Sequence, residues 1–276
     1  MKVEVPATTA NIGPGFDVLG ICLSLSNTYE LVDGQAIRPT LADRAYRRYY
    51  EYIGKEVPNK HIHIVEARIP SSSGLGSSAS LIVGGLVLAN ESEKHLDDLS
   101  LLMLAKELEG HADNVAPAIF GGLVLSADRS GQVLFKRYDL DPELYFVCFV
   151  PDYTLSTAEV RKVLPDTVSR REAIENVANT TMLTASLITK DYNELSHFFA
   201  DNFHEPYRKR FIKHYDRLKS LASLDDVIGV YLSGAGPTMI ALTQNPSVVI
   251  DYAHSRLNFA GTILSLTADN QGYEVK

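Results

Sequence analysis

The chain has 276 residues, of which 45% are hydrophobic, a size and composition typical of one large or two modest domains with a substantial core. Its 26 Lys and Arg face 34 Asp and Glu, giving a formal charge of −8, and no basic block interleaved with aromatic residues indicates a nucleic-acid surface. The longest apolar runs are far shorter than a membrane span, and the N-terminus lacks the apolar core of a signal peptide, so we expect a cytoplasmic protein.

The first half of the chain mixes strands with helices. Alternating or continuous runs of apolar residues predict strands over 2–5, 21–31, 61–69, 123–127, 133–138 and 145–150. Helical spacing of apolar or charged residues predicts helices over 43–53, 80–90 and 99–109. Gly and Pro predict two loops, 6–20 and 110–122.

The second half carries longer helical patterns. Helices are predicted over 169–189, 192–202, 207–223 and 246–258. Strands are predicted over 227–232, 239–243 and 262–267. Because hairpins are mixed with helices, the fold class is α+β rather than doubly wound α/β. A buried strand followed by "VPDY" predicts a boundary there, which gives domains 1–150 and 151–276.

The run "PSSSGLGSSAS", residues 70–80, sits between a predicted strand and an apolar helix. The first turn of a helix leaves N–H groups unpaired at its positive end, which favours an anion such as phosphate. Gly74 and Gly76 let the backbone approach such an anion, and the serines supply hydroxyl groups. The run is neither a Walker A motif nor GxGxxG, and a Ser-rich turn with an ordinary N-cap is the alternative interpretation.

Three stretches together resemble the GHMP small-molecule kinases: "PATTANIGPGFDVLG" (6–20), "PSSSGLGSSAS" (70–80) and "SGAGPT" (233–238). Within that superfamily, "GPGFDVLG" and "EGHADNVAPAIFGG" (109–122) resemble the homoserine kinases. The resemblance implies a GHMP kinase fold, with an N-terminal domain similar to the second domain of ribosomal protein S5 and a ferredoxin-like C-terminal α/β sandwich. It also implies ATP-dependent phosphorylation of the L-homoserine hydroxyl, in threonine biosynthesis, by a homodimer.

By the same resemblance, the Gly-rich run binds the phosphates of ATP, and Ser78 of the run and a nearby carboxylate bind the metal ion. The residues implied in wrapping the phosphates are Pro70, Ser71, Ser72, Ser73, Gly74, Leu75, Gly76, Ser77, Ser78, Ala79 and Ser80. The Ser78 hydroxyl is the implied ligand of Mg²⁺. By the same resemblance, a carboxylate from the helix before "GHADN" completes such a site. Glu107 is our choice, with Glu109 close behind because the spacing does not decide between them.

Homoserine is a zwitterion, so its pocket needs an anion, a cation and a polar group near the hydroxyl. By resemblance, seven residues form this pocket: Asn11, Asp17, His111, Asn114, Arg161, Arg208 and Gly234. The two arginines would hold the carboxylate, because a guanidinium pairs bidentately with it. His111 and Asn114 are the catalytic candidates.

Related kinases with other substrates carry an Asp where this chain has Asn114, and an amide cannot accept a proton. We therefore expect Asn114 to orient the hydroxyl, with Asp113 and Asp17 as the remaining possible bases. Two further functions stay open. One is a GHMP kinase that acts on another alcohol, such as mevalonate or a sugar, and the other is a non-catalytic relative that binds a ligand.

Overall fold

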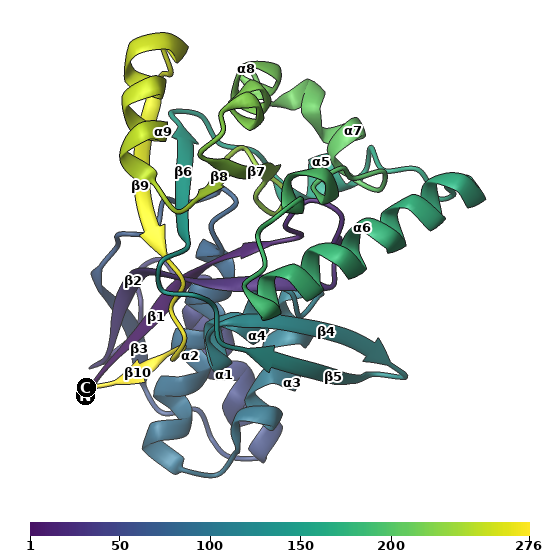
Figure 1. Cartoon of the computed structure of the whole chain (residues 1–276). Helices are drawn as coiled ribbons and strands as arrows, with labels where there is room; N and C mark the ends of the chain where they lie inside the picture. The colour runs from purple at the N-terminus through teal and green to yellow at the C-terminus, as the bar shows by residue number, and fades with distance from the viewer.

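Two antiparallel sheets form the frame of the structure, a computed structural model that describes residues 1–276 (Figure 1). The first sheet has the order β10-β1-β2-β4-β5, with β3 paired to β2. Its strands are β1 (Lys2–Ala10), β2 (Leu19–Asp33), β3 (Lys60–Glu66), β4 (Leu123–Arg129), β5 (Gln132–Tyr138) and β10 (Glu274–Val275). The second sheet has the order β7-β8-β6-β9, from β6 (Tyr145–Pro151), β7 (Val227–Leu232), β8 (Met239–Thr243) and β9 (Gly261–Thr267).

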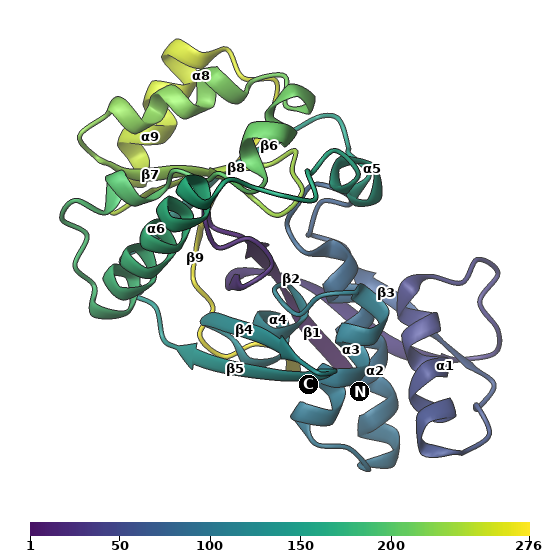
Figure 2. The same ribbon diagram turned by 90° about the vertical axis from the view of Figure 1, so that its right-hand side faces the viewer.

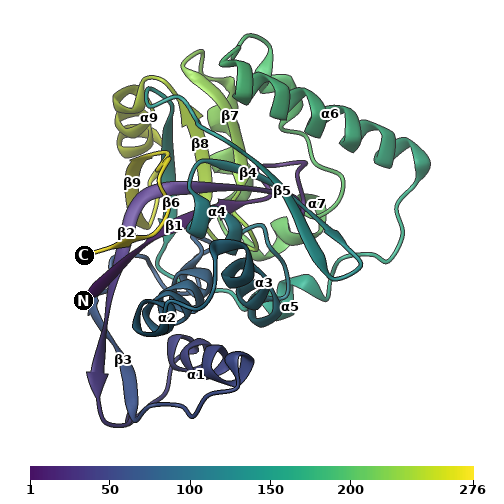
Figure 3. The same ribbon diagram turned by 90° about the horizontal axis from the view of Figure 1, so that it is seen from below.

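Four helices lie together on one side of the first sheet (Figure 3). They are α1 (Leu41–Ile53), α2 (Ser77–Glu93), α3 (Asp98–Glu109) and α4 (Val115–Phe120). The middle of α2 is buried, and its glycines allow close packing there. A Cβ on Gly85 would lie 2.1 Å from the carbonyl oxygen of Ala42, and one on Gly84 would lie 2.6 Å from the ring of Tyr29. Substituting either glycine would therefore push α2 away from α1 or from β2.

The strand β6 shows how the second sheet is covered on both faces. Phe146, Cys148 and Val150 share a core with residues of β2 and with Leu183 of α6 (Arg170–Thr189). Val147, on the opposite face, packs in a separate core with α8 (Tyr215–Lys219) and α9 (Pro246–Tyr252). Successive side chains of a strand point to opposite faces, so a continuous apolar run is what a strand covered on both sides requires. Figure 2 shows α6 on one side of this sheet and α8 and α9 on the other.

The second sheet has the ferredoxin-like topology that the resemblance implied. In chain order its main elements are β6, α6, β7, β8, α9 and β9, a split βαβ arrangement. Because β6 pairs with β8 and β9, the division between the two sheets falls between β5 and β6, a few residues before the domain boundary expected after residue 150. The last strand, β10, returns to pair with β1, and the two termini lie side by side (Figure 1).

Several predicted elements differ from the observed ones. The helix predicted over 192–202 is only a 3₁₀ turn (Leu195–Phe198), which the left-handed Glu194 precedes. The helix predicted over 207–223 is broken where the backbone of Ile212 becomes extended. Short helices replace it, namely α7 (Glu205–Arg208), α8 and the 3₁₀ turns Lys209–Phe211 and Ser220–Ser223.

Two short helices were missed and one was predicted too long. The segment predicted as a loop over 110–122 contains α4, and α5 (Thr157–Arg161) was not predicted. Such short helices carry little periodic signal. After α9 the chain continues as a π-helical turn (Ala253–Leu257), where one regular helix was predicted. None of the helices combines the length and the apolar character that crossing a membrane requires.

Candidate active site

A cavity of about 330 Å³ lies where the three motif stretches meet. It is lined by residues that are distant in the sequence but were predicted to share a site. The predicted residues that line it are Asn11, Asp17, Ser71, Ser72, Ser73, Gly74, Gly76, Ser77, Ser78, His111, Asn114, Arg161, Arg208 and Gly234. The structure therefore brings together both the predicted phosphate loop and the predicted substrate residues.

The glycines of the 70–80 run are required by its geometry. Gly76 is the residue before α2, with φ of +68°, and a Cβ there would lie 2.0 Å from the side-chain oxygen of Thr8. Gly74 also has positive φ, and its Cβ would lie 2.4 Å from the carbonyl oxygen of Ser233. No side chain caps the start of α2. The N–H groups of its first turn are therefore left for another acceptor, which fits an anion.

The Gly-rich run is joined to the "SGAGPT" turn by hydrogen bonds. The Thr238 amide donates to the Ser73 carbonyl at 3.0 Å, and the Ser233 hydroxyl donates to the Gly74 carbonyl at 2.6 Å. The "SGAGPT" turn therefore fixes the shape of the run.

Four of the eleven residues predicted to wrap the phosphates do not line the cavity: Pro70, Leu75, Ala79 and Ser80. Ser80 is fully buried, and its hydroxyl hydrogen bonds to Tyr29 at 2.8 Å and to the Val5 carbonyl at 3.2 Å. Leu75 is also fully buried, in the core shared by the two sheets. These side chains hold the run in place, and their prediction as phosphate contacts is not supported.

Of the two candidate metal carboxylates, Glu109 and not Glu107 contacts Ser78. The Glu107 carboxylate is exposed and accepts hydrogen bonds from Arg48 at 2.9 and 3.0 Å. Glu109, two residues later, faces the cavity and accepts a hydrogen bond from the Ser78 hydroxyl at 2.6 Å. Burial raises the pKa of Glu109, although the bond from Ser78 opposes the shift. Positions two apart lie on different sides of a helix, so only one of the two glutamates could reach the cavity.

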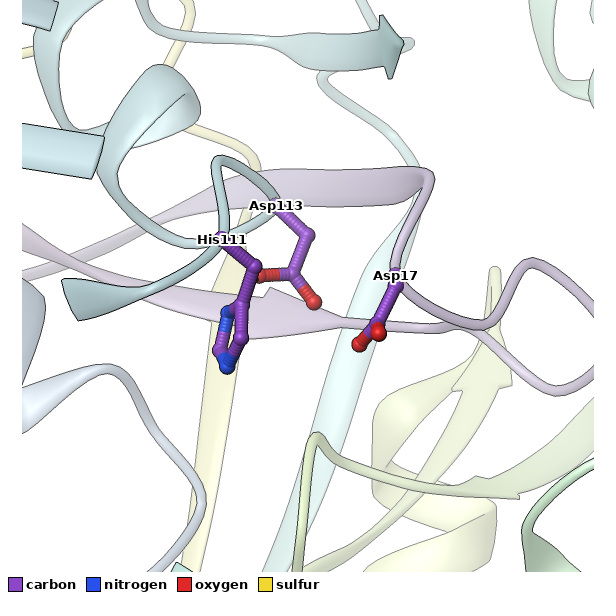
Figure 4. Close-up of side chains that lie close together, drawn as sticks. All are labelled: Asp17, His111 and Asp113. Carbon is purple, nitrogen blue, oxygen red and sulfur yellow. The ribbon is translucent and has the colours of Figure 1, made fainter. Parts of the chain in front are cut away.

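The "GHADN" stretch brings a histidine and a carboxylate into contact. His111 Nδ1 lies 2.7 Å from an oxygen of Asp113, and this hydrogen bond raises the pKa of His111. Asp113 is only 3% exposed, and the sequence analysis considered it only as a possible base. Figure 4 shows these two side chains together with Asp17. One ring nitrogen of His111 and one carboxylate oxygen from each of the two Asp residues lie within 4.8 Å of one another.

Asn114 is oriented by a residue that the sequence analysis missed. The Thr8 hydroxyl donates a hydrogen bond of 2.8 Å to its side-chain oxygen. The NH₂ group of Asn114 lies 3.4 Å from Asp113, so this bond is weak and the group remains available to another acceptor. The pairing of Thr8 with Asn114 had no local sequence signal, because 106 positions separate the two residues.

Asp17 and Arg161, which both line the cavity, form an ion pair, and one of its hydrogen bonds is 3.2 Å long. Asn11 supports this arrangement, because its side chain accepts from the Asp17 amide at 3.1 Å and donates to the Gly234 carbonyl at 2.9 Å. Phe16 was missed. The guanidinium of Arg161 lies 5.4 Å from the centre of its ring.

Arg208 is 2% exposed and reaches the same cavity from α7. Its Nη1 donates to the Gly234 carbonyl at 3.0 Å, and its Nε has no protein partner. Burial lowers its pKa to about 10, so the group still carries its positive charge at neutral pH. The cavity thus combines two guanidinium groups, the three carboxyl side chains of Asp17, Glu109 and Asp113, and the start of α2.

Together the fold and the site define a small-molecule kinase of the GHMP type. The family model of the GHMP kinases N terminal domain matches residues 40–122, and that of the GHMP kinases C terminal matches residues 183–255.

Two comparisons place the chain more narrowly, and a third concerns the fold alone. Homoserine kinase of Clostridium acetobutylicum is 37% identical over 260 residues, covering 88% of this chain and 88% of that protein. The crystal structure of homoserine kinase from Cytophaga hutchinsonii, at 27% identity, has a TM-score of 0.87 and covers 100% of this chain and 97% of that one. That of L. major mevalonate kinase in complex with R-mevalonate has a TM-score of 0.75 at 17% identity, covering 98% and 96%. The chain therefore belongs to the homoserine kinases within the GHMP kinase family.

Proposed function

We propose that this protein transfers the terminal phosphoryl group of ATP to the side-chain hydroxyl of L-homoserine, giving O-phospho-L-homoserine for threonine biosynthesis. One observation carries the proposal: a single cavity joins the uncapped start of α2 to an Asp and two Arg side chains. The first feature fits the phosphates of a nucleotide, and the second fits a zwitterion.

Asp17 and Arg161 are suited to the two charges of an amino acid. In the structure they pair with each other, so each already faces a group of the charge that it would meet on the substrate. The substrate ammonium would take the place of Arg161 beside Asp17, and its carboxylate would pair with Arg161 and Arg208. Both guanidinium groups lie close to the Phe16 ring, at 5.4 and 5.2 Å from its centre, and both arginines line the cavity.

The residues beside the loop fit Mg²⁺. A hydroxyl and a carboxylate, those of Ser78 and Glu109, lie 2.6 Å apart at the cavity wall, and both are oxygen donors of the type that Mg²⁺ prefers. These two residues would hold the ion, which neutralises phosphate charge when bound. The raised pKa of Glu109 fits a carboxylate that a cation would help to keep ionised.

The remaining polar groups would align the hydroxyl. The hydroxyl oxygen forms the new bond to phosphorus, while the bond to the bridging oxygen breaks and ADP leaves. The NH₂ group of Asn114 would hold that oxygen, since the bond from Thr8 fixes the orientation of the amide. Because an amide accepts no proton, we propose that the hydroxyl proton passes to the transferred phosphate or to water, with Asp17 and Asp113, which also line the cavity, as the alternative acceptors. The rate would then depend mainly on the alignment of the reacting groups.

The test is ATP turnover with a panel of alcohols that includes L-homoserine, R-mevalonate and galactose, with the product identified by mass spectrometry. We expect a gain of one phosphoryl group on homoserine and little turnover of the others. Turnover of mevalonate or a sugar instead would establish another GHMP kinase, and binding without turnover would indicate a non-catalytic relative. Light scattering of the same sample tests the expected homodimer, and cell fractionation tests the cytoplasmic location.

A further inference from the structure

His204 is completely buried and does not line the cavity, yet it contacts three groups around it. Its Nε2 lies 3.0 Å from the carbonyl oxygen of Gly13, and its Nδ1 lies 3.2 Å from Nη1 of Arg208. Its ring stacks on Phe16, with centroids 5.3 Å apart and an interplanar angle of 23°. His204 therefore connects the loop after β1 to the arginine of α7.

These contacts define one protonation state of the ring. A carbonyl only accepts a hydrogen bond and a guanidinium only donates, so Nε2 carries the proton and Nδ1 accepts from Arg208. The Asp201 carboxylate, 3.6 Å from Nε2, also favours a proton on that nitrogen. Burial lowers the pKa of His204, which keeps the ring neutral. A protonated ring would lose the acceptor at Nδ1.

Asp201 also fixes the backbone from which the ring projects. Its carboxylate accepts hydrogen bonds from the amides of Phe203, His204 and Glu205, at 2.9, 2.8 and 2.7 Å. The side chain of His204 thus has little freedom to move on its own.

Arg208 depends on His204 because it has few other partners. Its Nη1 has two acceptors, the Gly234 carbonyl and the imidazole, and its buried Nε has none. One hydrogen bond leaves a planar group free to rotate about that bond, whereas two acceptors at different positions fix its plane. The plane decides whether the guanidinium can meet a carboxylate with two parallel bonds.

We propose that His204 is a positioning residue that fixes the plane of the Arg208 guanidinium toward the substrate carboxylate and ties it to the loop carrying Phe16. The inference rests on the proposed function for the identity of the substrate. His204 itself does not line the cavity, and its Nδ1 is the atom that holds the guanidinium in place.

Two substitutions test the roles of the two imidazole nitrogens separately. In His204→Asn the amide oxygen comes near the position of Nδ1 and can accept from Arg208, whereas in His204→Gln the amide reaches the position of Nε2 and can bond to Gly13. Both lose the stack on Phe16 to a similar degree. His214→Gln is the matched control, because His214 packs edge-on against Phe259, away from the cavity.

The readout is the KM for L-homoserine and for 3-aminopropan-1-ol, which is homoserine without its carboxylate. In His204→Gln we expect the KM for homoserine to rise about tenfold or more, as for loss of a hydrogen bond to a charged group, with kcat and the KM for ATP little changed. His204→Asn should recover most of the affinity, and 3-aminopropan-1-ol should show the same KM in every variant.

Three results would overturn the proposal: equal loss in both variants, equal loss with 3-aminopropan-1-ol, or a comparable loss in His214→Gln. A crystal structure of His204→Gln gives a readout independent of the substrate, because we expect the plane of the Arg208 guanidinium to rotate about its remaining hydrogen bond to the Gly234 carbonyl, and an unchanged plane contradicts the inference. If the unaltered protein does not phosphorylate homoserine, the proposed function fails, and this structural readout still decides the role of His204.

Discussion

Glu109→Gln tests the metal site most directly. The amide keeps the size of the side chain and can still accept from the Ser78 hydroxyl, now 2.6 Å from the carboxylate, so the substitution removes only the negative charge. Removing groups that merely support a metal ligand costs about 10- to 100-fold in affinity or activity. For a direct ligand we therefore expect kcat/KM at limiting Mg²⁺ to fall at least about 100-fold, with partial recovery at high Mg²⁺. The assay is ATP-dependent phosphorylation of homoserine measured over a range of Mg²⁺ concentrations.

The sign of the stability change separates this loss from misfolding. Because burial raises the folded-state pKa of Glu109, its ionised form is less favourable in the folded than in the unfolded chain, and the stability it contributes increases as pH falls through that pKa. Glu109→Gln should therefore unfold at neutral pH at a temperature no lower than the unaltered protein. Glu107→Gln is the matched control, since it removes only the surface pair with Arg48, worth about 0.2–1 kcal/mol. Unchanged Mg²⁺ dependence in Glu109→Gln, or a kinetic loss in Glu107→Gln, would refute the reasoning.

Three further predictions concern the same region. Gly76→Ala should lower the free energy of unfolding by about 2–5 kcal/mol, because the new methyl group overlaps Thr8 and the residue must still adopt positive φ. The control is Gly54→Ala, at φ of +69° with nothing within 4 Å of the added Cβ, which should cost only about 1–2 kcal/mol. Equal losses in urea unfolding of the two variants would contradict this prediction. Asn114→Ala should lower kcat for homoserine with little change in the KM for ATP, and an unchanged kcat would exclude the orienting role. The raised pKa of His111 means that its stabilising contribution is full below the unfolded-state pKa and is lost as pH rises through the folded-state value. His111→Gln should therefore destabilise the protein more at a pH of about 5 than at a pH of about 9. If the loss of unfolding free energy were the same at both pH values, the stabilising pair of His111 with Asp113 would be disproved.

The sequence predicted most strands and the uninterrupted helices well, and short or broken helices poorly. The strand predicted over 239–243 is observed with the same bounds as β8, and α1 and α3 begin within two residues of their predictions. Their apolar spacing reflects burial that extends along each element. The broken region after α7 was predicted as one helix, because periodicity does not report the extended Ile212, whose side chain packs in the core beside α8.

Site residues were predicted where a motif carried them and missed where only the tertiary structure brings them together. Asp17 and Ser78 lie in recognisable stretches, and both line the cavity. Thr8 orients Asn114, and His204 contacts Arg208. No sequence motif marks either pair, because the tertiary structure brings the partners together. The spacing could not decide between Glu107 and Glu109 for a related reason, because carboxylates two residues apart near the end of a helix differ in the direction they face, and only Glu109 lines the cavity.

The 70–80 run shows why a packing interpretation and a ligand interpretation of one motif need not compete. Gly76 has to be glycine because Thr8 occupies the place of its Cβ, even before any nucleotide is considered. Thr8 also donates its hydroxyl to Asn114, whose side chain lines the cavity. Packing at Gly76 is thus coupled to the alignment of the substrate hydroxyl, so a substitution there should disturb the phosphate loop and Asn114 together.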